Sequence, residues 1–411
     1  SERILGGLDM SFSEWREVAL KDVIEFNPKE SIKKGTITKK IGMDKLAPFQ
    51  RKIDGFELEA FKGGSKFRNG DTLLARITPC LENGKTAQVT ILDDDDEVAF
   101  GSTEYIVLRH KIGITDNNYI FYLALSQYVR DTAIKSMTGT SGRQRAQTDV
   151  IENTKIMLPP LEEQKAIAHI LSTLDDKIEV NNQINKTLEN MAQAIFKQWF
   201  VDFEFPNEDG EPYKSSGGEM IESELGMIPK GWEVVKLNSV VDICYGKNLP
   251  TKNLLSDGYP VFGGNGQIGF YSEYLYEKSQ VLIACRGAAS GKVIISLPYS
   301  FVTNNSLVLE QNGTSVTHEY LKQFCLENEF YNYATGSAQP QITIANLANA
   351  NILIPQRDLM NMFSLIRNSI DHEVLSLFNE NNKLVAIRDA LLPKLMSGEI
   401  RVSLDAEDDA S

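Results

Sequence analysis

The stretch Leu158-Pro-Pro-Leu-Glu-Glu-Gln-Lys165 opens the longest periodic segment of the chain. Proline is tolerated just before a helix, because the first N–H groups of a helix have no intrahelical partner. In the residues that follow, side chains recur at alternating steps of four and three, which is the spacing of a coiled-coil seam. We therefore predict a helix over residues 158–205. Its seam positions are Ile167, Leu171, Leu174, Ile178, Asn181, Asn185, Leu188, Ile195 and Trp199.

A second segment carries the same pattern 196 residues later, after Ile354-Pro355. It predicts a helix over residues 356–399, with Arg367 and Arg388 interrupting its seam. A helix of about forty residues is a rod of roughly 60 Å that needs a partner along its seam. We expect the two helices of this chain to pair with each other. The second seam consists of Phe363, Ile370, Val374, Leu377, Asn381, Leu384, Leu391 and Leu395.

Two globular blocks, residues 11–157 and 232–355, repeat each other as the helices do. Trp15 and Trp232 open them at an offset of 217 residues, and the spacing of the apolar residues that follow is the same. Between the first helix and the second block, residues 206–231 are polar and contain several prolines and glycines, which predicts a linker. The chain is therefore predicted to be α+β with an internal duplication, closed by a pseudo-two-fold pairing of its two helices.

Within the blocks, short β-branched and apolar runs bounded by turn residues predict strands. The predicted strands are residues 72–76, 105–108, 154–158, 281–284 and 307–309. Residues 119–135 have helical spacing and predict one helix of the first block. The acidic tip at residues 93–97 is interpreted as a solvated loop, because consecutive carboxylates cannot all converge on one ion.

Composition places the chain among globular proteins of two or three domains. Its four cysteines are far apart and form no CxxC motif, which favours a reduced cytoplasmic protein. We find no apolar run that could span a bilayer. Residues 1–9 could be native or an added sequence, because Met10 is a plausible start.

The formal net charge of −14 argues against a nucleic-acid binder unless the charge is unevenly distributed. Residues 11–155 carry 22 basic and 21 acidic side chains, and residues 232–355 carry 7 and 9. Most of the excess acid thus lies on the helices and linkers. DNA contact would need basic residues focused on one face, or a basic partner.

Motifs that would indicate a nucleotide site or catalysis are incomplete. Gly264-Asn-Gly-Gln-Ile-Gly269 fits GxGxxG, but a strand-like segment follows where a dinucleotide site needs a helix, so we interpret it as a β-turn. Gly84-Lys85-Thr86 resembles the end of a phosphate loop, but Pro79 stands where that loop needs its first glycine. The four histidines have no metal-ligand spacing, and we predict neither a metal site nor a catalytic residue.

Polar loop residues recur at matched places in the two blocks and suit contact with DNA. Arginine pairs bidentately with guanine and glutamine with adenine in the major groove, while lysine after glycine can meet a phosphate. Each residue, taken singly, is more simply interpreted as a solvated loop residue. Their recurrence in both blocks strengthens the interpretation that they contact DNA. The candidates are Arg76, Lys85, Thr86, Ser102, Thr103, Arg143, Gln144, Arg145, Asn265, Gln267, Arg286, Lys292, Asn304, Asn305, Gln339 and Gln341.

Three stretches resemble the specificity subunit of type I restriction–modification enzymes, and the resemblance covers nearly the whole chain. Leu158-Pro-Pro-Leu-Glu-Glu-Gln-Lys-Ala-Ile-Ala168 is similar to the start of that family's central conserved helix. Ser223-Glu-Leu-Gly-Met-Ile-Pro-Lys-Gly-Trp-Glu233 is similar to its lead-in to a second target recognition domain, and Tyr259-Pro-Val-Phe-Gly-Gly-Asn-Gly-Gln-Ile-Gly-Phe270 to a segment of such domains. The second helix departs from the pattern, since Ile354-Pro-Gln-Arg-Asp-Leu359 lacks the Glu-Gln pair.

The resemblance implies two α/β target recognition domains, residues 11–157 and 232–355, joined by an antiparallel coiled coil of the two long helices. Each domain would read one half of a bipartite, asymmetric double-stranded DNA site, with the coiled coil setting the spacing. The chain itself would be non-catalytic and bind no cofactor. The resemblance also implies two methyltransferase subunits that bind S-adenosylmethionine, and usually two restriction subunits that use ATP and Mg²⁺, in a phage-defence system.

Two alternatives remain open at this point. One is a specificity subunit of a methylation-only or phage-exclusion system. The other is a coiled-coil adaptor whose globular blocks bind no DNA, which the acidic balance favours. A chain that is an enzyme by itself is disfavoured by the incomplete motifs.

Overall fold

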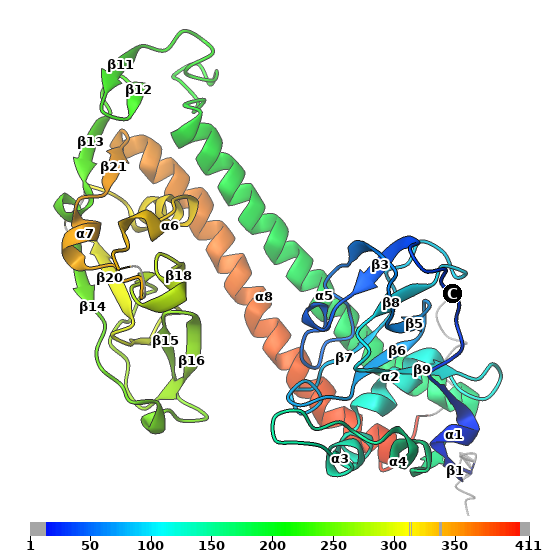
Figure 1. The fold of residues 1–411 in the computed structure, drawn as a ribbon. Coiled ribbons are helices and arrows are strands. Elements are labelled where there is room, and N and C mark those ends of the chain that lie inside the picture. Colours follow the sequence, from blue (N-terminus) through cyan, green and yellow to red (C-terminus); the bar gives the residue numbers. More distant parts are fainter. Residues whose placement is uncertain (1–13, 312, 314, 337–338, 403–411) are drawn as a thin grey trace, which may run out of the picture. The chain divides into compact units, whose positions relative to one another are not determined.

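The computed structural model describes residues 14–311, 313, 315–336 and 339–402, so the proposed start at Met10 lies outside the described residues. The chain divides into two compact units. Unit 1 contains the described residues of Ser1–Asn182 and Phe378–Ser411, and unit 2 contains those of Gln183–Leu377. Each unit combines one of the predicted globular blocks with part of each long helix (Figure 1). The mixed α+β class is confirmed.

Unit 1 contains two four-stranded sheets and one strand pair. The first sheet is antiparallel, in the order β2 (Ile24–Phe26), β9 (Tyr105–His110), β6 (Thr72–Ala75) and β7 (Thr86–Gln88). The second has the order β4 (Glu57–Ala60), β3 (Ile37–Ile41), β8 (Ala99–Gly101) and β5 (Ser65–Phe67), and its β3–β8 pair is parallel. Strand β1 (Arg16–Ala19) pairs antiparallel with β10 (Lys155–Leu158).

Unit 2 repeats this plan. Its first sheet is antiparallel in the order β14 (Val241–Tyr245), β20 (Ser306–Gln311), β17 (Val281–Ala284) and β18 (Val293–Ile295). Its second has the order β16 (Gly266–Tyr271), β15 (Tyr259–Gly263) and β19 (Phe301–Val302), again with one parallel pair, β15–β19. Strand β13 (Glu233–Lys236) pairs with β21 (Asn351–Ile354). The matched strand orders confirm the internal duplication.

Successive side chains of a strand point to opposite faces of its sheet. In the first sheet of each unit both faces are buried. In unit 1, Leu74 and Ile106 face one apolar cluster while Leu73 and Val107 face another. Helix α2 (Asn117–Leu125) covers the first of these faces (Figure 1). In unit 2, helix α6 (His318–Glu327) packs on β17 and β18 in the same way.

The two long helices are α5 (Leu161–Phe196) and α8 (Arg357–Ser397), and each contributes residues to both units. Within unit 1 they run antiparallel, because Asp175 meets Arg388 while the later residue Asn181 meets the earlier residue Asn381. Within unit 2, Glu189 meets Arg367 and the Phe196 ring lies 5.6 Å from Phe363. All predicted seam residues are buried or half-buried, as a helix–helix seam requires.

Two predicted elements are wrong in detail. The single helix expected at residues 119–135 is two helices, α2 and α3 (Gln127–Lys135), because Ser126 takes an extended ψ and its hydroxyl caps the N–H of Val129. The first long helix ends at Phe196 and continues as a π-helical turn, Lys197–Val201, rather than running to residue 205.

The predicted linker, residues 206–231, contains ordered structure in unit 2. Strands β11 (Met220–Ser223) and β12 (Gly226–Pro229) form a hairpin, whose turn is closed by Gly226 at a positive φ. The ring of Tyr213 stacks on Phe205 at 4.5 Å. The segment that its prolines and glycines predict to be a linker is thus ordered in unit 2.

The shorter helices are α1 (Leu20–Val23) and α4 (Thr148–Glu152) in unit 1 and α7 (Ile344–Ala348) in unit 2. No helix in the described part of the chain combines the length and the apolarity needed to cross a membrane.

Candidate nucleic-acid interface

In unit 1, three loops that are far apart in the sequence meet just beyond the end of strand β6. The Arg76 carbonyl accepts a hydrogen bond of 2.8 Å from the N–H of Ala146, and the Arg76 N–H donates to the Glu104 carbonyl at 2.9 Å. Arg145 also forms a β-bridge with Ile77. This backbone frame brings together Arg76 and Arg145, which the sequence predicted, and Glu104, which it did not.

The side chains of this cluster form an ion pair on the surface of unit 1. The Arg145 Nε lies 2.9 Å from Glu104 Oε2, and the Arg145 Nη2 lies 2.6 Å from Glu104 Oε1. The hydrogen bonds from Arg145 hold the pKa of the Glu104 carboxyl below its ordinary value, although partial burial opposes this. Arg76 adds a second positive charge, with its Nε 3.8 Å from Glu104.

Unit 2 builds the same frame with other side chains. The N–H of Cys285 donates to the Asn305 carbonyl at 3.0 Å, and the N–H of Ile342 donates to the Cys285 carbonyl at 3.0 Å. Gln341 forms a β-bridge with Arg286, as Arg145 does with Ile77 in unit 1. Gln341 therefore occupies the place of Arg145, and Asn305 that of Glu104. The side chains of Arg286, Asn305 and Gln341 are all exposed.

The two Gly-Lys turns are matched in backbone but not in side chain. Gly84 and Gly291 both have a positive φ, and a Cβ atom at Gly291 would lie 2.4 Å from the backbone nitrogen of Tyr331. Lys292 is exposed, with its Nζ 3.3 Å from the Asn265 carbonyl. Lys85 instead turns inward, and its Nζ donates to the Met43 carbonyl at 2.8 Å. This placement favours Lys292 over Lys85 as a phosphate contact.

The remaining predicted residues of unit 1 differ in access. Thr86 lies in the buried strand β7 and is 1% exposed, so the prediction that it contacts DNA is not supported by its position. The Ser102 hydroxyl accepts a hydrogen bond from the N–H of Glu104 at 3.1 Å. Thr103 and Arg143 are exposed, and Gln144 is half-buried. The sequence could not separate these residues, because loop residues and a short buried strand have similar composition.

In unit 2, the other predicted residues lie in accessible loops or on an open strand. Asn265 and Gln267 sit at and just after the turn between β15 and β16, and both are exposed. Gln339 is exposed and Asn304 is half-buried. The GxGxxG motif forms this β15–β16 hairpin, which confirms its interpretation as a glycine-rich turn.

An open hollow of about 570 Å³ lies beside the ion-paired cluster of unit 1. Arg76 and Thr103 line it together with Lys29, Lys66 and Glu30. The Glu30 carboxylate is already engaged by two arginines, with Arg109 Nη1 at 2.7 Å. Three cations at the rim of this hollow provide the local positive charge that contact with a phosphate backbone requires.

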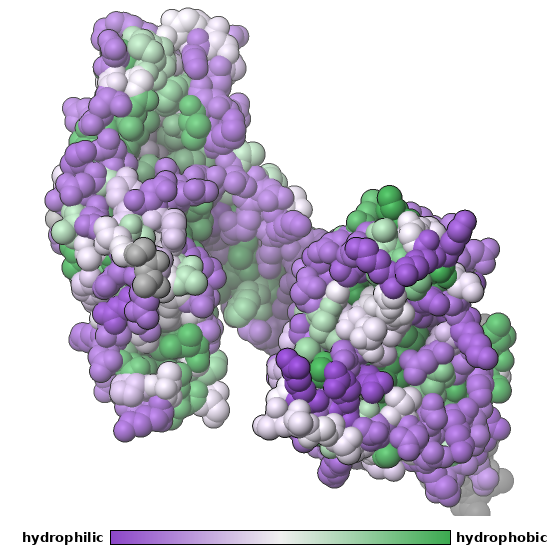
Figure 2. All heavy atoms as spheres, viewed as in Figure 1, coloured by the Kyte–Doolittle hydropathy of each residue, from purple (hydrophilic) through white to green (hydrophobic). Residues whose placement is uncertain are grey.

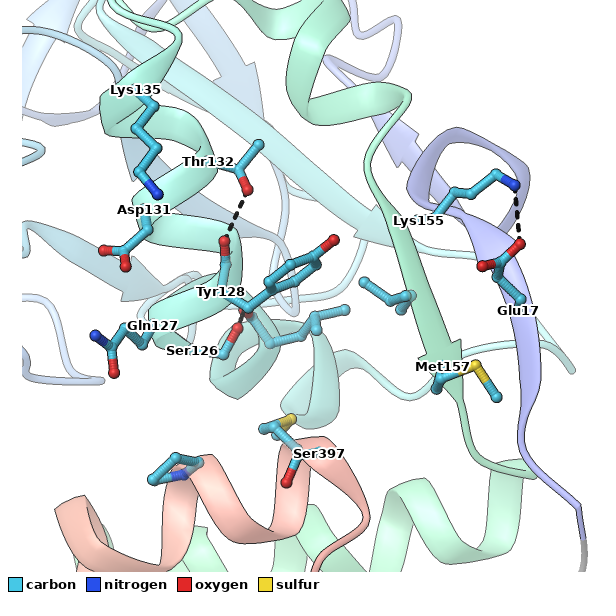
Figure 3. Close-up of a pocket in the computed structure, with 14 residues that line it drawn as sticks. Glu17, Ser126, Gln127, Tyr128, Asp131, Thr132, Lys135, Lys155, Met157 and Ser397 are labelled. Atoms are coloured by element: carbon cyan, nitrogen blue, oxygen red, sulfur yellow. Dashed lines mark hydrogen bonds and ion pairs between the residues drawn. The ribbon is translucent and has the colours of Figure 1, made fainter.

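A second hollow, in unit 2, holds two predicted residues. Its volume is about 700 Å³, and Asn265 and Lys292 line it with Gly291 and Tyr331. A third hollow, of about 660 Å³, lies in unit 1 between α3, β10 and the end of α8 (Figure 3). Met157 and Tyr128 line it, and Glu17 and Lys155 pair across 2.8 Å at its edge. The predicted DNA-contacting residues are absent from its described lining.

The visible surface of both units is largely hydrophilic, with local hydrophobic groups (Figure 2). One group lies over β15 and β16 in unit 2 (Figure 2). Ile268 of β16 is 41% exposed, and Leu255, which forms a β-bridge with Phe270 of the same strand, is 49% exposed. The long helices also carry exposed apolar residues outside their seam. These are Val180, Phe378 and Ile387 in unit 1, and Ile184, Met191, Met362, Leu365 and Leu375 in unit 2.

Among the described residues, no group of three or more His, Cys, Asp or Glu side chains has the arrangement of a metal site. The cations and amides described above can bind an anionic, hydrogen-bonding polymer.

Comparison with known proteins gives a consistent result. The family described as "Type I restriction modification DNA specificity domain" matches residues 12–190 and 229–372. The chain is 27% identical over 313 residues to the MjaIX specificity subunit of Methanocaldococcus jannaschii, covering 70% of this chain and 69% of that protein. It is 26% identical over 411 residues to the HindI specificity subunit of Haemophilus influenzae, covering 81% and 87%.

A solved structure shares the fold. The crystal structure of the S subunit of a type-I restriction-modification system from M. genitalium aligns with a TM-score of 0.54 at 17% sequence identity. The alignment covers 95% of this chain and 98% of that one. The alignment shows that the two chains share a fold.

Proposed function

The chain belongs to the family of type I restriction–modification DNA specificity domains, and on that premise we propose how it reads DNA. Unit 1 and unit 2 each contact one half of a bipartite, asymmetric site in double-stranded DNA. The contacts are made by the loop clusters around Arg145 in unit 1 and Gln341 in unit 2. The chain supplies the DNA sequence specificity of the assembly and carries no catalytic residue of its own.

The observation that carries this proposal is the repeated loop frame. The same backbone hydrogen bonds hold Arg145 in one unit and Gln341 in the other, so two different side chains are presented from one scaffold. A fold that keeps its frame and changes the exposed side chain suits two readers with different targets. Arginine and glutamine are also the side chains best suited to base edges in the major groove.

The proposed assembly includes two methyltransferase subunits and usually two restriction subunits. S-adenosylmethionine, ATP and Mg²⁺ would be bound by these partners, and the assembly would act in the cytoplasm against phage DNA. The exposed apolar residues on α5 and α8 are the proposed docking positions for these partners, because exposed apolar patches mark protein–protein contacts. Basic partners around the DNA would also offset the net charge of −14 on this chain.

The test uses the full chain assembled with its methyltransferase partner, with methylation mapped across a genome. The double variant Gln339→Ala with Gln341→Ala should relax or change the sequence required in one half-site only. The matched double variant Arg143→Ala with Arg145→Ala should do so in the other half-site. Equal loss at both half-sites in either variant would contradict the assignment of one reader to each unit. A wild-type complex without sequence-specific methylation or binding would contradict the proposed function.

We further propose that the two long helices set the length of the unread spacer between the half-sites. Both helices pass without a break from one unit into the other. Removing seven residues from each helix shortens it by about 10 Å, which corresponds to about three base pairs of B-DNA. The methylated sites of this variant should have a spacer shorter by about that number, and an unchanged spacer would contradict the proposal.

A further inference from the structure

We propose that Glu104 is a positioning residue that presents Arg145 to a guanine, so that unit 1 reads a G·C pair at its loop cluster. At the equivalent place in unit 2, Gln341 and Asn305 read an A·T pair. This inference rests on the proposed function and adds to it the class of base pair read by each unit, together with a role for a glutamate.

The geometry of the ion pair leaves one edge of the Arg145 guanidinium available. Glu104 accepts from Nε and from Nη2, which is the side edge of the group. Among the described residues, the end edge, formed by Nη1 and the second hydrogen of Nη2, meets the Arg143 carbonyl at 3.5 Å and no other acceptor. The Arg145 side chain as a whole is 41% exposed, which is compatible with access of DNA to this edge.

An end edge with two parallel N–H donors matches the N7 and O6 acceptors of guanine in the major groove. A free arginine would have to lose its side-chain freedom on binding. The hydrogen bonds from Nε and Nη2 of Arg145 to the Glu104 carboxylate, which the backbone frame supports, restrict that freedom before DNA arrives. The guanidinium is therefore preorganised for a base rather than mobile among phosphates.

The ion pair also changes what Arg145 contributes electrostatically. A carboxylate 2.6 Å away offsets most of the positive charge that distant phosphates would feel. Arg145 then adds little to the non-specific attraction that makes binding depend on salt. It still donates hydrogen bonds at short range, which is how a base is identified. The pair thus favours specificity over general affinity.

Unit 2 lacks a carboxylate at this place, because Asn305 stands where unit 1 has Glu104. Gln341, at the place of Arg145, presents an amide with one donor and one acceptor side by side. That pattern matches the N6 donor and N7 acceptor of adenine. The side chains of Asn305 and Gln341 are exposed, as direct contact with a base requires.

The experiment measures base preference in the complex of the full chain with its methyltransferase partner. DNA libraries are randomised in one half-site at a time, and bound sequences are counted. The wild-type complex should require a G·C pair at one position of the unit 1 half-site. Arg145→Gln should lower that preference by about 10- to 100-fold and favour A·T there, because one bidentate contact is exchanged for the other.

The variant Glu104→Gln separates positioning from structural support. It removes the charge that offsets Arg145, so binding to random DNA should strengthen and its salt dependence should steepen by up to about one phosphate contact. At the same time the preference for G·C should fall. A merely structural role would weaken binding to every sequence without changing the preferred base. Glu82→Gln, an exposed glutamate of the same unit, is the matched control and should leave the base preference unchanged.

The outcomes distinguish this inference from the proposed function. If the wild-type complex selects a bipartite site but Arg145→Gln keeps the same base at every position, the inference is wrong and the proposed function stands. If Glu104→Gln keeps its G·C preference, the positioning role is wrong. If the wild-type complex selects no sequence at all, the proposed function itself fails.

Discussion

The two units use different interactions where their globular part meets their long helices. In unit 1, the Trp15 indole N–H donates to Glu163 at 3.0 Å, and Arg401 binds the same carboxylate at 2.7 Å. In unit 2, Trp232 packs among aromatic rings, with Phe205 at 5.3 Å and Phe203 at 5.5 Å. The same position in a duplicated fold is thus filled once by a polar network and once by an aromatic cluster.

The difference follows from one residue of each helix. Leu359, which lies 196 residues after Glu163, is 6% exposed and belongs to the apolar core of unit 2. A buried leucine at this position needs only apolar packing. The Glu163 carboxylate, whose side chain is 2% exposed, needs hydrogen-bond donors. Unit 1 recruits those donors from residues more than a hundred positions away in the chain. The duplicated frame therefore tolerates either chemistry, even though the buried Trp232 indole nitrogen has no hydrogen-bond partner among the described residues.

Removing Trp232 tests the aromatic side of this comparison and should have the largest effect. Trp232 is 2% exposed, and Trp232→Ala leaves a cavity that should cost about 4 kcal/mol of folding free energy. Trp15→Ala should cost less, because Trp15 is only half-buried. The measurement is urea-induced unfolding, with hydrogen exchange followed separately in peptides from each unit. Equal losses for the two variants would show that the junctions do not differ as described.

The ion pairs of the helices extend the comparison. In unit 1, Asp175 and Arg388 are each 8% exposed, 2.8 Å apart, and Tyr122 donates to the same carboxylate. In unit 2, the side chain of Glu189, which pairs with Arg367, is 43% exposed. An ion pair shielded from water depends more strongly on both partners than one that water can replace.

Asp175→Ala should therefore destabilise unit 1 by about 3 kcal/mol, because, among the described residues, the buried Arg388 would keep only the exposed Asp389 as an ion-pair partner and the Tyr122 hydroxyl would lose its acceptor. Glu189→Ala should cost about 1 kcal/mol or less, since Asp371 still pairs with Arg367 at 2.8 Å. The double variant Asp175→Ala with Arg388→Met should recover much of the stability. Unfolding free energies of the full chain check all three. A double variant as unstable as Asp175→Ala would mean that lost packing, not the unpaired charge, carries the cost.

Lowering the pH tests the polar junction of unit 1 alone and should give the smallest change in stability. Burial opposes ionisation of Glu163, but the hydrogen bonds from Arg401 and Trp15 outweigh it and lower the pKa of the carboxyl. A lowered pKa contributes stability above the ordinary value of 4.5, and that stability is lost as pH falls through the folded pKa. Glu163→Gln should cost about 2 kcal/mol at pH 7 and less in acid. Leu359→Met in unit 2 is the control and should show no such pH dependence.

Much of the architecture was predictable because it depends on local spacing. The steps of four and three fixed which side of each long helix is covered, and the constant offsets between Trp15 and Trp232 and between the two helices revealed the duplication. The turn at Gly264 was also predictable, because the segment after it could not begin a helix. These patterns repeat within a few residues or at fixed offsets, so no tertiary information is needed.

The missed features are those whose partners lie far apart in the chain. Arg388 seemed to interrupt the seam because its partner Asp175 is 213 positions away. Glu104 was missed among the predicted DNA contacts because nothing near it in the sequence indicates Arg145 as its partner. The hairpin at residues 220–229 is different, since its two strands pair with each other; its composition predicts a linker, and Ile228 of its second strand lies in the apolar core of unit 2.

The amino-acid sequence alone thus determined the two helices with their seam, the repeated blocks and the resemblance to a family, since periodicity and repetition are properties of the chain itself. Only the tertiary structure decided which charges are paired, which lysine faces solvent and which loop residues meet. These depend on contacts between distant segments, and a buried or paired group is defined by its neighbours in space.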